Sequence, residues 1–267
     1  MTLSFFAAQG GEVPVILCQP ADKPAERGEI LREQLAERGI DLPAYGEIRG
    51  TLVLLHGRKG RKEDLLPVAE RFVAVGYRCL LPDLPAHGES PLRRVRFGAD
   101  PQEAALPMAV LQEAQERFHW EFGPKGLWGM SMGGAFAIHA MGQWEARIVV
   151  ASFADLEEVA EEFCRKWAGP AGPLASHLAL SLASMRGDFD YRSVKPRESA
   201  RRIKSPTLVA HGTEDELLSL AEGMRLYRAV GAPQKRWLAV PDGGHDDVLI
   251  TPMELYAEMA MWYATHL

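Results

Sequence analysis

The chain lacks an apolar run long enough to cross a membrane. Spanning a bilayer takes roughly 18 to 20 consecutive apolar residues, and no stretch of the 267 residues approaches that length. Residues 1–13 also lack the basic segment and sustained apolar stretch of a secretory signal. The sequence therefore predicts a cytoplasmic protein with no membrane partner.

Cysteine is scarce, and acidic residues outnumber basic ones. Cys18, Cys79 and Cys164 are far apart and form no Cys-x-x-Cys or mixed Cys and His pattern, so the sequence predicts no metal site. Cys18 and Cys79 lie in apolar segments, and we expect both to be buried thiols. The net charge of −6 argues against a nucleic-acid partner, because phosphate binding requires a basic surface.

Short apolar runs without polar alternation recur along the chain, as in strands buried on both faces. The predicted strands are 13–18, 51–56, 77–82, 126–130, 147–152, 207–211 and 236–240. Segments with helical periodicity accompany them at 25–38, 63–75, 101–118, 132–143, 218–230 and 252–266. This alternation predicts an α/β fold with a mostly parallel central sheet and helices on both faces.

Two segments interrupt the alternation. Residues 1–50 are interpreted as an N-terminal edge hairpin plus a helical insertion. Residues 153–204 are too long for a simple connection, and their helical segments 156–167 and 174–185 are separated by a Gly- and Pro-rich break. We expect this second segment to form a cap over the sheet, so that 1–267 is a single domain with two insertions.

The pentapeptide Gly129-Met130-Ser131-Met132-Gly133 joins a predicted strand to a predicted helix. That context is typical of a nucleophile elbow, a tight turn in which small residues two positions either side of the nucleophile avoid a clash. The turn exposes the serine hydroxyl above the sheet. Ser131 is therefore the candidate nucleophile.

A serine hydroxyl needs an adjacent base, and the base needs an orienting carboxylate. Asp215 lies in the loop after the predicted strand 207–211, and His245 lies in the loop after 236–240. Loops at the carboxyl ends of parallel strands open on the same side of a sheet. The sequence therefore predicts that Ser131, Asp215 and His245 converge.

Alternatives remain for the acid and the base. Glu214 and Asp155 also follow predicted strands and could replace Asp215, while His245 could be only a turn residue. Asp246 and Asp247 are weaker candidates, because neighbouring side chains diverge. The other histidines near strand ends or in the helix after Ser131 are interpreted as structural: His56, His87, His139 and His211.

Four segments, in this order and spacing, resemble the α/β-hydrolase superfamily: Leu54-Leu-His-Gly57, Asp83-Leu-Pro-Ala-His-Gly-Glu-Ser90, Gly129 to Gly134, and His211-Gly-Thr-Glu-Asp215 with Gly244-His245. The chain is similar to the carboxylesterase and prolyl-oligopeptidase-like branches, whose dienelactone-hydrolase relatives use cysteine as nucleophile. The resemblance implies Ser131 as nucleophile, Asp215 as orienter and His245 as base. It also implies an oxyanion hole from the backbone N–H groups of Arg58 and Met132, and no cofactor.

The predicted function is that of a serine hydrolase that cleaves a carboxylic ester of a small molecule through an acyl-serine intermediate. An acyltransferase, thioesterase or peptidase could use the same triad, since the pocket selects the acceptor and the leaving group. A ligand-binding member of the fold is the alternative outside enzymes. An aspartate nucleophile is disfavoured, because position 131 is serine. The sequence does not indicate which oligomeric state the protein has.

Two groups of side chains bear on the substrate. The basic cluster Arg58-Lys59-Gly60-Arg61-Lys62, with Arg93, Arg94 and Arg96, either attracts an anionic substrate group or forms a solvated surface. Apolar residues of the predicted cap either line an acyl pocket or pack on the domain. These cap residues are Phe153, Phe163, Trp167, Leu174, Leu178 and Met185.

Overall fold

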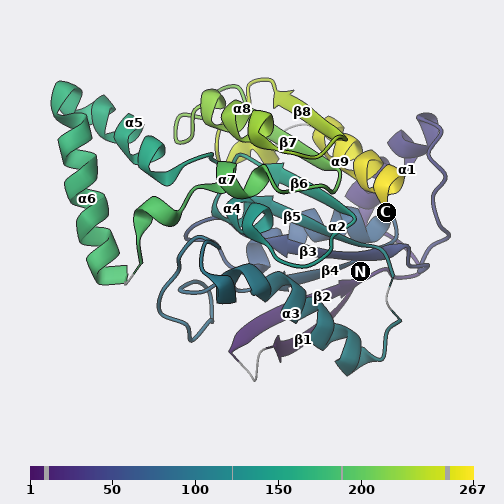
Figure 1. Ribbon diagram of the computed structural model, residues 1–267. Helices are drawn as coiled ribbons and strands as arrows, with labels where there is room; N and C mark the ends of the chain where they lie inside the picture. The colour runs from purple at the N-terminus through teal and green to yellow at the C-terminus, as the bar shows by residue number, and fades with distance from the viewer. Residues whose placement is uncertain (9–11, 122, 188, 250–252) are drawn as a thin grey trace.

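A computed structural model describes residues 1–8, 12–121, 123–187, 189–249 and 253–267 (Figure 1). Within these residues a single eight-stranded sheet has the order β1-β2-β4-β3-β5-β6-β7-β8. The strands are β1 Thr2–Ala8, β2 Val13–Gln19, β3 Gly50–Leu55, β4 Tyr77–Pro82, β5 Lys125–Met130, β6 Ala146–Val150, β7 Thr207–Gly212 and β8 Lys235–Val240. Neighbours from β4 to β8 are parallel, whereas β1 and β2 form an antiparallel hairpin at one edge.

The central strands are buried on both faces. Every residue of β3 and of β7 is buried, which explains why their sequences are continuous apolar runs. Alternate residues of β3 enter opposite cores, with Leu52 and Leu54 on one face and Val53 and Leu55 on the other. The predicted mostly parallel sheet with two apolar faces is thus confirmed.

Helices cover both faces. The core that contains Leu52 is closed by α1 Glu26–Glu37, α2 Leu66–Ala74 and α9 Met253–His266. The opposite core is closed by α3 Pro101–Phe118, α4 Met132–His139 and α8 Leu220–Ala229, next to the short helix α7 Pro196–Ala200. Residue 252, where we predicted the last helix to begin, lies outside the described residues.

One predicted helix is too long. We expected 132–143 to be helical, but α4 ends at His139 because Ala140 is extended and Gly142 has a φ of +91°. The apolar pattern continues past the helix end because Ala140 and Trp144 still enter the core.

The segment between β6 and β7 contains α5 Leu156–Ala168 and α6 Gly172–Gly187, which lie side by side and project from the body (Figure 1). Several of their large apolar side chains are exposed, with Trp167 and Met185 at 82% each, whereas Leu180 of α6 is buried. The interpretation that these side chains pack on the domain is therefore wrong for five of them, which are exposed: Phe163, Trp167, Leu174, Leu178 and Met185. Phe153, in contrast, is buried. No helix in the described part of the chain is long and apolar enough to cross a membrane.

Candidate active site

Ser131 lies between β5 and α4 in a strained backbone conformation, with φ 54° and ψ −117°. Such a conformation costs roughly 1–3 kcal/mol and persists only when its surroundings enforce it. Here the Ser131 N–H donates to the carbonyl of Val150 at 2.9 Å, and the Ser152 hydroxyl donates to the carbonyl of Ser131 at 2.8 Å. The end of β6 therefore holds the turn in place.

Glycines make the tight turn possible. A Cβ on Gly133 would lie 2.0 Å from the carbonyl oxygen of Leu55, and one on Gly129 would lie 2.2 Å from that of Gly133. Both neighbours are backbone atoms of the sheet or of the elbow, which cannot move aside. The glycines predicted from the pentapeptide are thus required sterically at these two positions.

The structure brings Ser131, His245 and Asp215 together. Nε2 of His245 lies 3.0 Å from Oγ of Ser131, and Nδ1 lies 2.8 Å from Oδ2 of Asp215. The Asp215 carboxylate accepts a hydrogen bond from Nδ1–H of His245, which leaves Nε2 as the proton acceptor that faces the serine hydroxyl. This is the geometry of a hydroxyl activated by an oriented imidazole.

Asp215 is held by more than His245. Its Oδ1 accepts hydrogen bonds from the backbone N–H groups of Leu217 and Leu218, at 3.0 and 2.8 Å. His211, on β7, places Nε2 3.3 Å from Oδ2 and 2.8 Å from the carbonyl oxygen of Leu218. Burial raises the pKa of Asp215, but the hydrogen bonds from His211, His245 and Leu218 outweigh burial and bring it well below its usual range. The carboxylate is therefore ionised at neutral pH.

The contact with His211 is a feature that our sequence reasoning missed. We interpreted His211 only as a structural support, whereas its ring is fully buried against the carboxylate and closes the loop that carries Asp215. The spacing of four positions between His211, near the end of β7, and Asp215, in the loop after it, was the available signal.

The peptide between Gly57 and Arg58 lies beside Ser131. A Cβ on Gly57 would be 3.4 Å from Cβ of Ser131. Two donors hold the Gly57 carbonyl, namely Nδ1 of His56 at 2.8 Å and the N–H of Gly60 at 3.1 Å. In a trans peptide the next N–H points opposite to the carbonyl, so these bonds also fix the direction of the Arg58 N–H.

The proton of His56 can be placed. Its Nε2 accepts a hydrogen bond from the N–H of Leu84 at 3.0 Å, so the ring proton is on Nδ1. The Nδ1–H group therefore donates a hydrogen bond to the carbonyl oxygen of Gly57. Burial lowers the pKa of His56, which keeps the ring neutral.

The second predicted oxyanion-hole donor is the backbone N–H of Met132. Met132 is the first residue of α4, and its N–H consequently has no acceptor within the helix.

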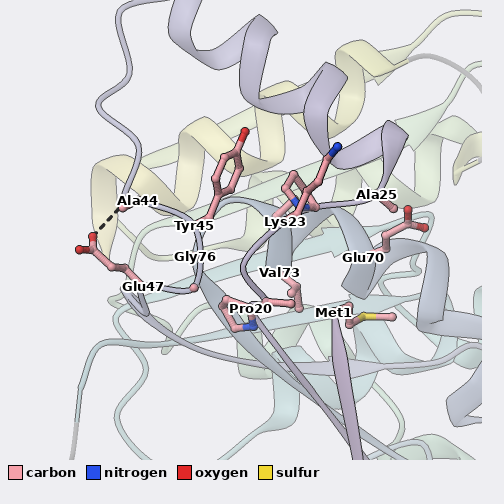
Figure 2. A pocket seen from close by; sticks show the side chains of 14 residues that line it. Met1, Pro20, Lys23, Ala25, Ala44, Tyr45, Glu47, Glu70, Val73 and Gly76 are labelled. Atoms are coloured by element: carbon pink, nitrogen blue, oxygen red, sulfur yellow. Dashed lines mark hydrogen bonds between the residues drawn. The ribbon is translucent and has the colours of Figure 1, made fainter.

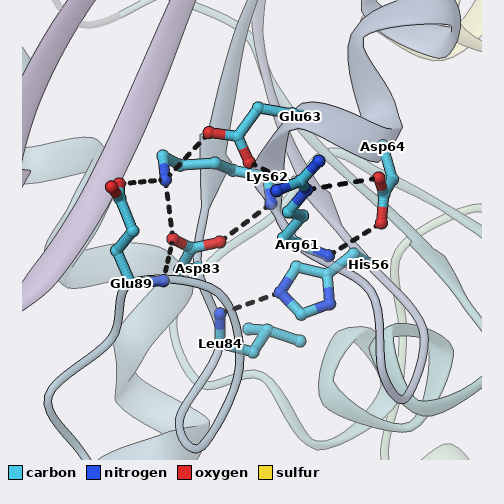
Figure 3. Close-up of polar contacts among 8 residues, drawn as sticks. All are labelled: His56, Arg61, Lys62, Glu63, Asp64, Asp83, Leu84 and Glu89. Carbon is cyan, nitrogen blue, oxygen red and sulfur yellow. Dashed lines mark hydrogen bonds and ion pairs between the residues drawn. The ribbon is translucent and has the colours of Figure 1, made fainter.

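A buried ion cluster supports the loop that contains Arg58 (Figure 3). Lys62 is only 3% exposed, and its ammonium group contacts Asp83 at 2.8 Å, Glu89 at 2.6 Å and Glu63 at 3.0 Å. Burial lowers the pKa of Lys62, but the three carboxylates outweigh it and raise the pKa above its usual value. The cluster joins the loop after β3 to the loop after β4.

The predicted basic cluster is therefore smaller than expected. Lys62 is buried and neutralised, and Arg61 forms ion pairs with Glu63 and Asp64. Arg58 and Lys59 are exposed. Arg93, Arg94 and Arg96 line a separate cavity of about 310 Å³ with Glu103 and Asp100.

The alternative acids have other partners or surroundings. Asp155 accepts from the N–H of Glu157 at the start of α5 and forms an ion pair with Arg197 at 3.0 Å. Glu214 is exposed. Neither side chain contacts His245, whereas Asp215 does.

A cavity that Ser131 does not line lies between the start of α1, residues 44–47 and α2 (Figure 2). Its volume of about 30 Å³ accommodates water but no acyl substrate, since one water needs roughly 10–15 Å³. Among the described residues, no group of three or more His, Cys, Asp or Glu side chains could hold a metal ion.

Comparison with known families places this geometry in context. A family model described as serine aminopeptidase, S33, a hydrolase family, matches residues 46–200, which is more than half of the chain. The chain belongs to this family. As an S33-family hydrolase it is a member of the α/β-hydrolase superfamily, in agreement with its sheet order and elbow.

Relatives of this S33-family chain match it over different lengths. The protein YqkD of Bacillus subtilis is 24% identical over 78% of the chain and 72% of its own length. The mouse alpha/beta hydrolase domain-containing protein 17C is 32% identical over 32% of the chain. The match spans only about a quarter of that relative's own length.

Solved structures share the fold at low sequence identity. An esterase of Pyrococcus furiosus has a TM-score of 0.68 and 16% identity, covering 99% of this chain and 92% of the esterase. A cold-adapted esterase from an Arctic intertidal metagenomic library has a TM-score of 0.59 and 19% identity, covering 99% and 93%. These likenesses confirm the predicted α/β-hydrolase fold.

Proposed function

We propose that this hydrolase cleaves carboxylic esters of small molecules, with Ser131 as nucleophile, His245 as general base and Asp215 as its orienting carboxylate. The observation that carries the proposal is the single imidazole of His245, which spans Oγ of Ser131 at 3.0 Å and Oδ2 of Asp215 at 2.8 Å.

In the first half-reaction, Oγ of Ser131 bonds to the ester carbonyl carbon while its proton passes to Nε2 of His245. The backbone N–H groups of Arg58 and Met132 stabilise the oxyanion of the tetrahedral intermediate. The bond to the leaving oxygen then breaks, and His245 returns the proton to the departing alcohol. An acyl-Ser131 remains.

In the second half-reaction, His245 removes a proton from water as the water oxygen attacks the acyl carbon. The bond to Oγ of Ser131 breaks, and the proton on His245 restores the serine hydroxyl. Asp215 stays ionised throughout and stabilises the imidazolium formed in both steps.

The test is hydrolysis of p-nitrophenyl esters of graded acyl length by the wild type and by Ser131→Ala. The proposal predicts a loss of at least about 10³-fold in kcat for the variant, as is typical of removing a serine nucleophile. A variant that folds and retains wild-type kcat on the esters would contradict the assignment.

A peptidase is the second candidate, and the family description as serine aminopeptidase favours it. The same three residues can cleave an amide, because the pocket chooses the leaving group. Aminoacyl p-nitroanilides with a free amino group, measured beside matched esters, decide between the two. Because activated esters react faster than anilides in any serine hydrolase, turnover of the anilides that is lost in Ser131→Ala would favour the peptidase.

We also propose that the exposed cation of Arg58 favours esters that carry an anionic group, since a positive rim raises the local concentration of an anion. Arg58→Gln retains the backbone N–H and removes only the charge. Its expected effect is a higher KM for succinyl monoesters than for neutral esters, with a smaller difference in high salt. An unchanged ratio of kcat/KM for the two ester classes argues against the charge having this role.

A further inference from the structure

A groove lies at the opposite end of the sheet from Ser131. It is bordered by the end of α4, the start of β6 and the segment after α7, and its volume is about 660 Å³. Arg147, near the start of β6, lines this groove, whereas Val150 at the other end of β6 bonds the Ser131 N–H. The two residues are three positions apart along the strand, which corresponds to roughly 10 Å.

Three cations line the groove, namely Arg147, Arg202 and Lys204. Within the part of the chain that the structure describes, none of them forms an ion pair with a carboxylate. The carboxylate that also lines the groove belongs to Glu145, and it pairs with Lys125 at 3.0 Å. The lining therefore carries excess positive charge on a chain whose net charge is −6.

Arg147 is the unusual member of this set. Its residue is 6% exposed, and arginine is rarely buried so deeply unless it is paired with an anion. Its guanidinium donates to the carbonyl of Ala137 at 3.2 Å and to the hydroxyl of Ser205. These neutral acceptors satisfy N–H groups but leave the charge without a counter-ion, and burial lowers the Arg147 pKa to about 10.

Arg202 and Lys204 lie toward the solvent side. Both are exposed, and Arg202 donates to the hydroxyl of Ser199 at 2.9 Å and to the carbonyl of Glu198 at 3.3 Å. The hydroxyls of Ser199 and Ser205 line the same groove. Cations and hydroxyls around one concavity are the donors that phosphoryl and carboxylate oxygens require.

We propose that this groove binds a small ligand that carries at least two negative charges on phosphoryl or carboxylate groups. The volume is within the roughly 300–1,000 Å³ that is usual for small-molecule sites. The proposal is independent of the esterase activity, because its residues lie at the other end of the sheet.

The test is isothermal titration of the full chain with two probes, pyrophosphate and citrate, at low ionic strength and again with added NaCl. Saturable one-to-one binding that weakens with salt is expected, as for association between opposite charges. The double variant Arg202→Gln, Lys204→Gln should weaken binding by at least about tenfold. Arg201→Gln is the control, because Arg201 is an exposed neighbour that does not line the groove.

Binding of pyrophosphate alone assigns a phosphoryl ligand, and binding of citrate alone assigns a polycarboxylate. Binding of both probes supports a site that recognises multiple negative charges rather than one type of anionic group. The proposal is overturned if neither probe binds, or if Arg201→Gln weakens binding as much as the double variant. A thermal unfolding scan of each variant shows whether a loss of binding reflects a loss of fold.

Discussion

Ser131 occupies a backbone conformation that serine rarely adopts, and the two flanking glycines allow it by letting β3 and α4 approach closely. The strain is held by hydrogen bonds from the end of β6 rather than relieved. This is why a five-residue pattern can be interpreted so directly: its glycines have no sterically acceptable replacement.

We predict that Gly133→Ala abolishes ester hydrolysis and lowers the free energy of unfolding by about 3 kcal/mol, because overpacking against backbone cannot be relieved by side-chain motion. The new Cβ would meet the carbonyl oxygen of Leu55 at 2.0 Å. Urea denaturation and kcat measure the effect. Gly123→Ala is the matched control, since no atom lies within 4 Å of its Cβ, and it should leave both quantities unchanged.

His211 should act as a positioning residue for Asp215. His211→Asn removes the donor to Leu218 and Asp215, so we expect kcat to fall by about tenfold, at little change in KM, with a shifted pH profile. His119→Asn, at an exposed left-handed position, is the control. A pH profile identical to that of the wild type would show that His211 has only a packing role.

At the scale of elements, the loop after β3 is attached to the loop after β4 by one buried ammonium group. Lys62→Met leaves Asp83 buried without its cation, which we expect to cost about 3–5 kcal/mol of unfolding free energy. The variant should also lower kcat, since the same loop directs the Arg58 N–H. Chemical denaturation and ester hydrolysis measure the two effects.

Lys59→Met provides the comparison, because Lys59 is an exposed lysine of the same loop. Its stability and kcat should stay near those of the wild type. If Lys62→Met proves as stable as Lys59→Met, the cluster does not hold the loop.

The sequence predicted most of these elements because buried parallel strands have an unmistakable pattern. It predicted less well wherever a contact depends on distant residues. Lys62 stands in a run of cations, and it is buried because it contacts carboxylates such as that of Asp83, 21 residues away. Similarly, the apolar pattern of 174–185 predicts a helix, but cannot tell which surface, if any, its leucines cover.

For the whole molecule, stability depends on pH through the half-buried His139 and the buried His56. Burial, with a smaller contribution from Arg202, lowers the pKa of His139 from 6.5 to about 4. Between these values the unfolded chain binds a proton that the folded chain does not. The free energy of unfolding should therefore fall as pH drops from about 6.5 toward 4, and the lowered pKa of His56 acts in the same direction.

Urea denaturation at several pH values across this range checks the prediction, and His139→Asn should flatten the dependence. The same slope in the variant and the wild type would exclude His139 as a source of acid sensitivity.

The central claim for the whole molecule is that three distant loops assemble one reactive serine. The most direct measurement is labelling of the folded protein with a fluorophosphonate, followed by intact mass and peptide mapping, in the wild type and in His245→Gln. We predict one adduct on Ser131 in the wild type, formed at least about 100-fold more slowly in the variant because the proton acceptor is lost. A folded wild-type protein that acquires no adduct on Ser131, or labels at the same rate without His245, would contradict the account.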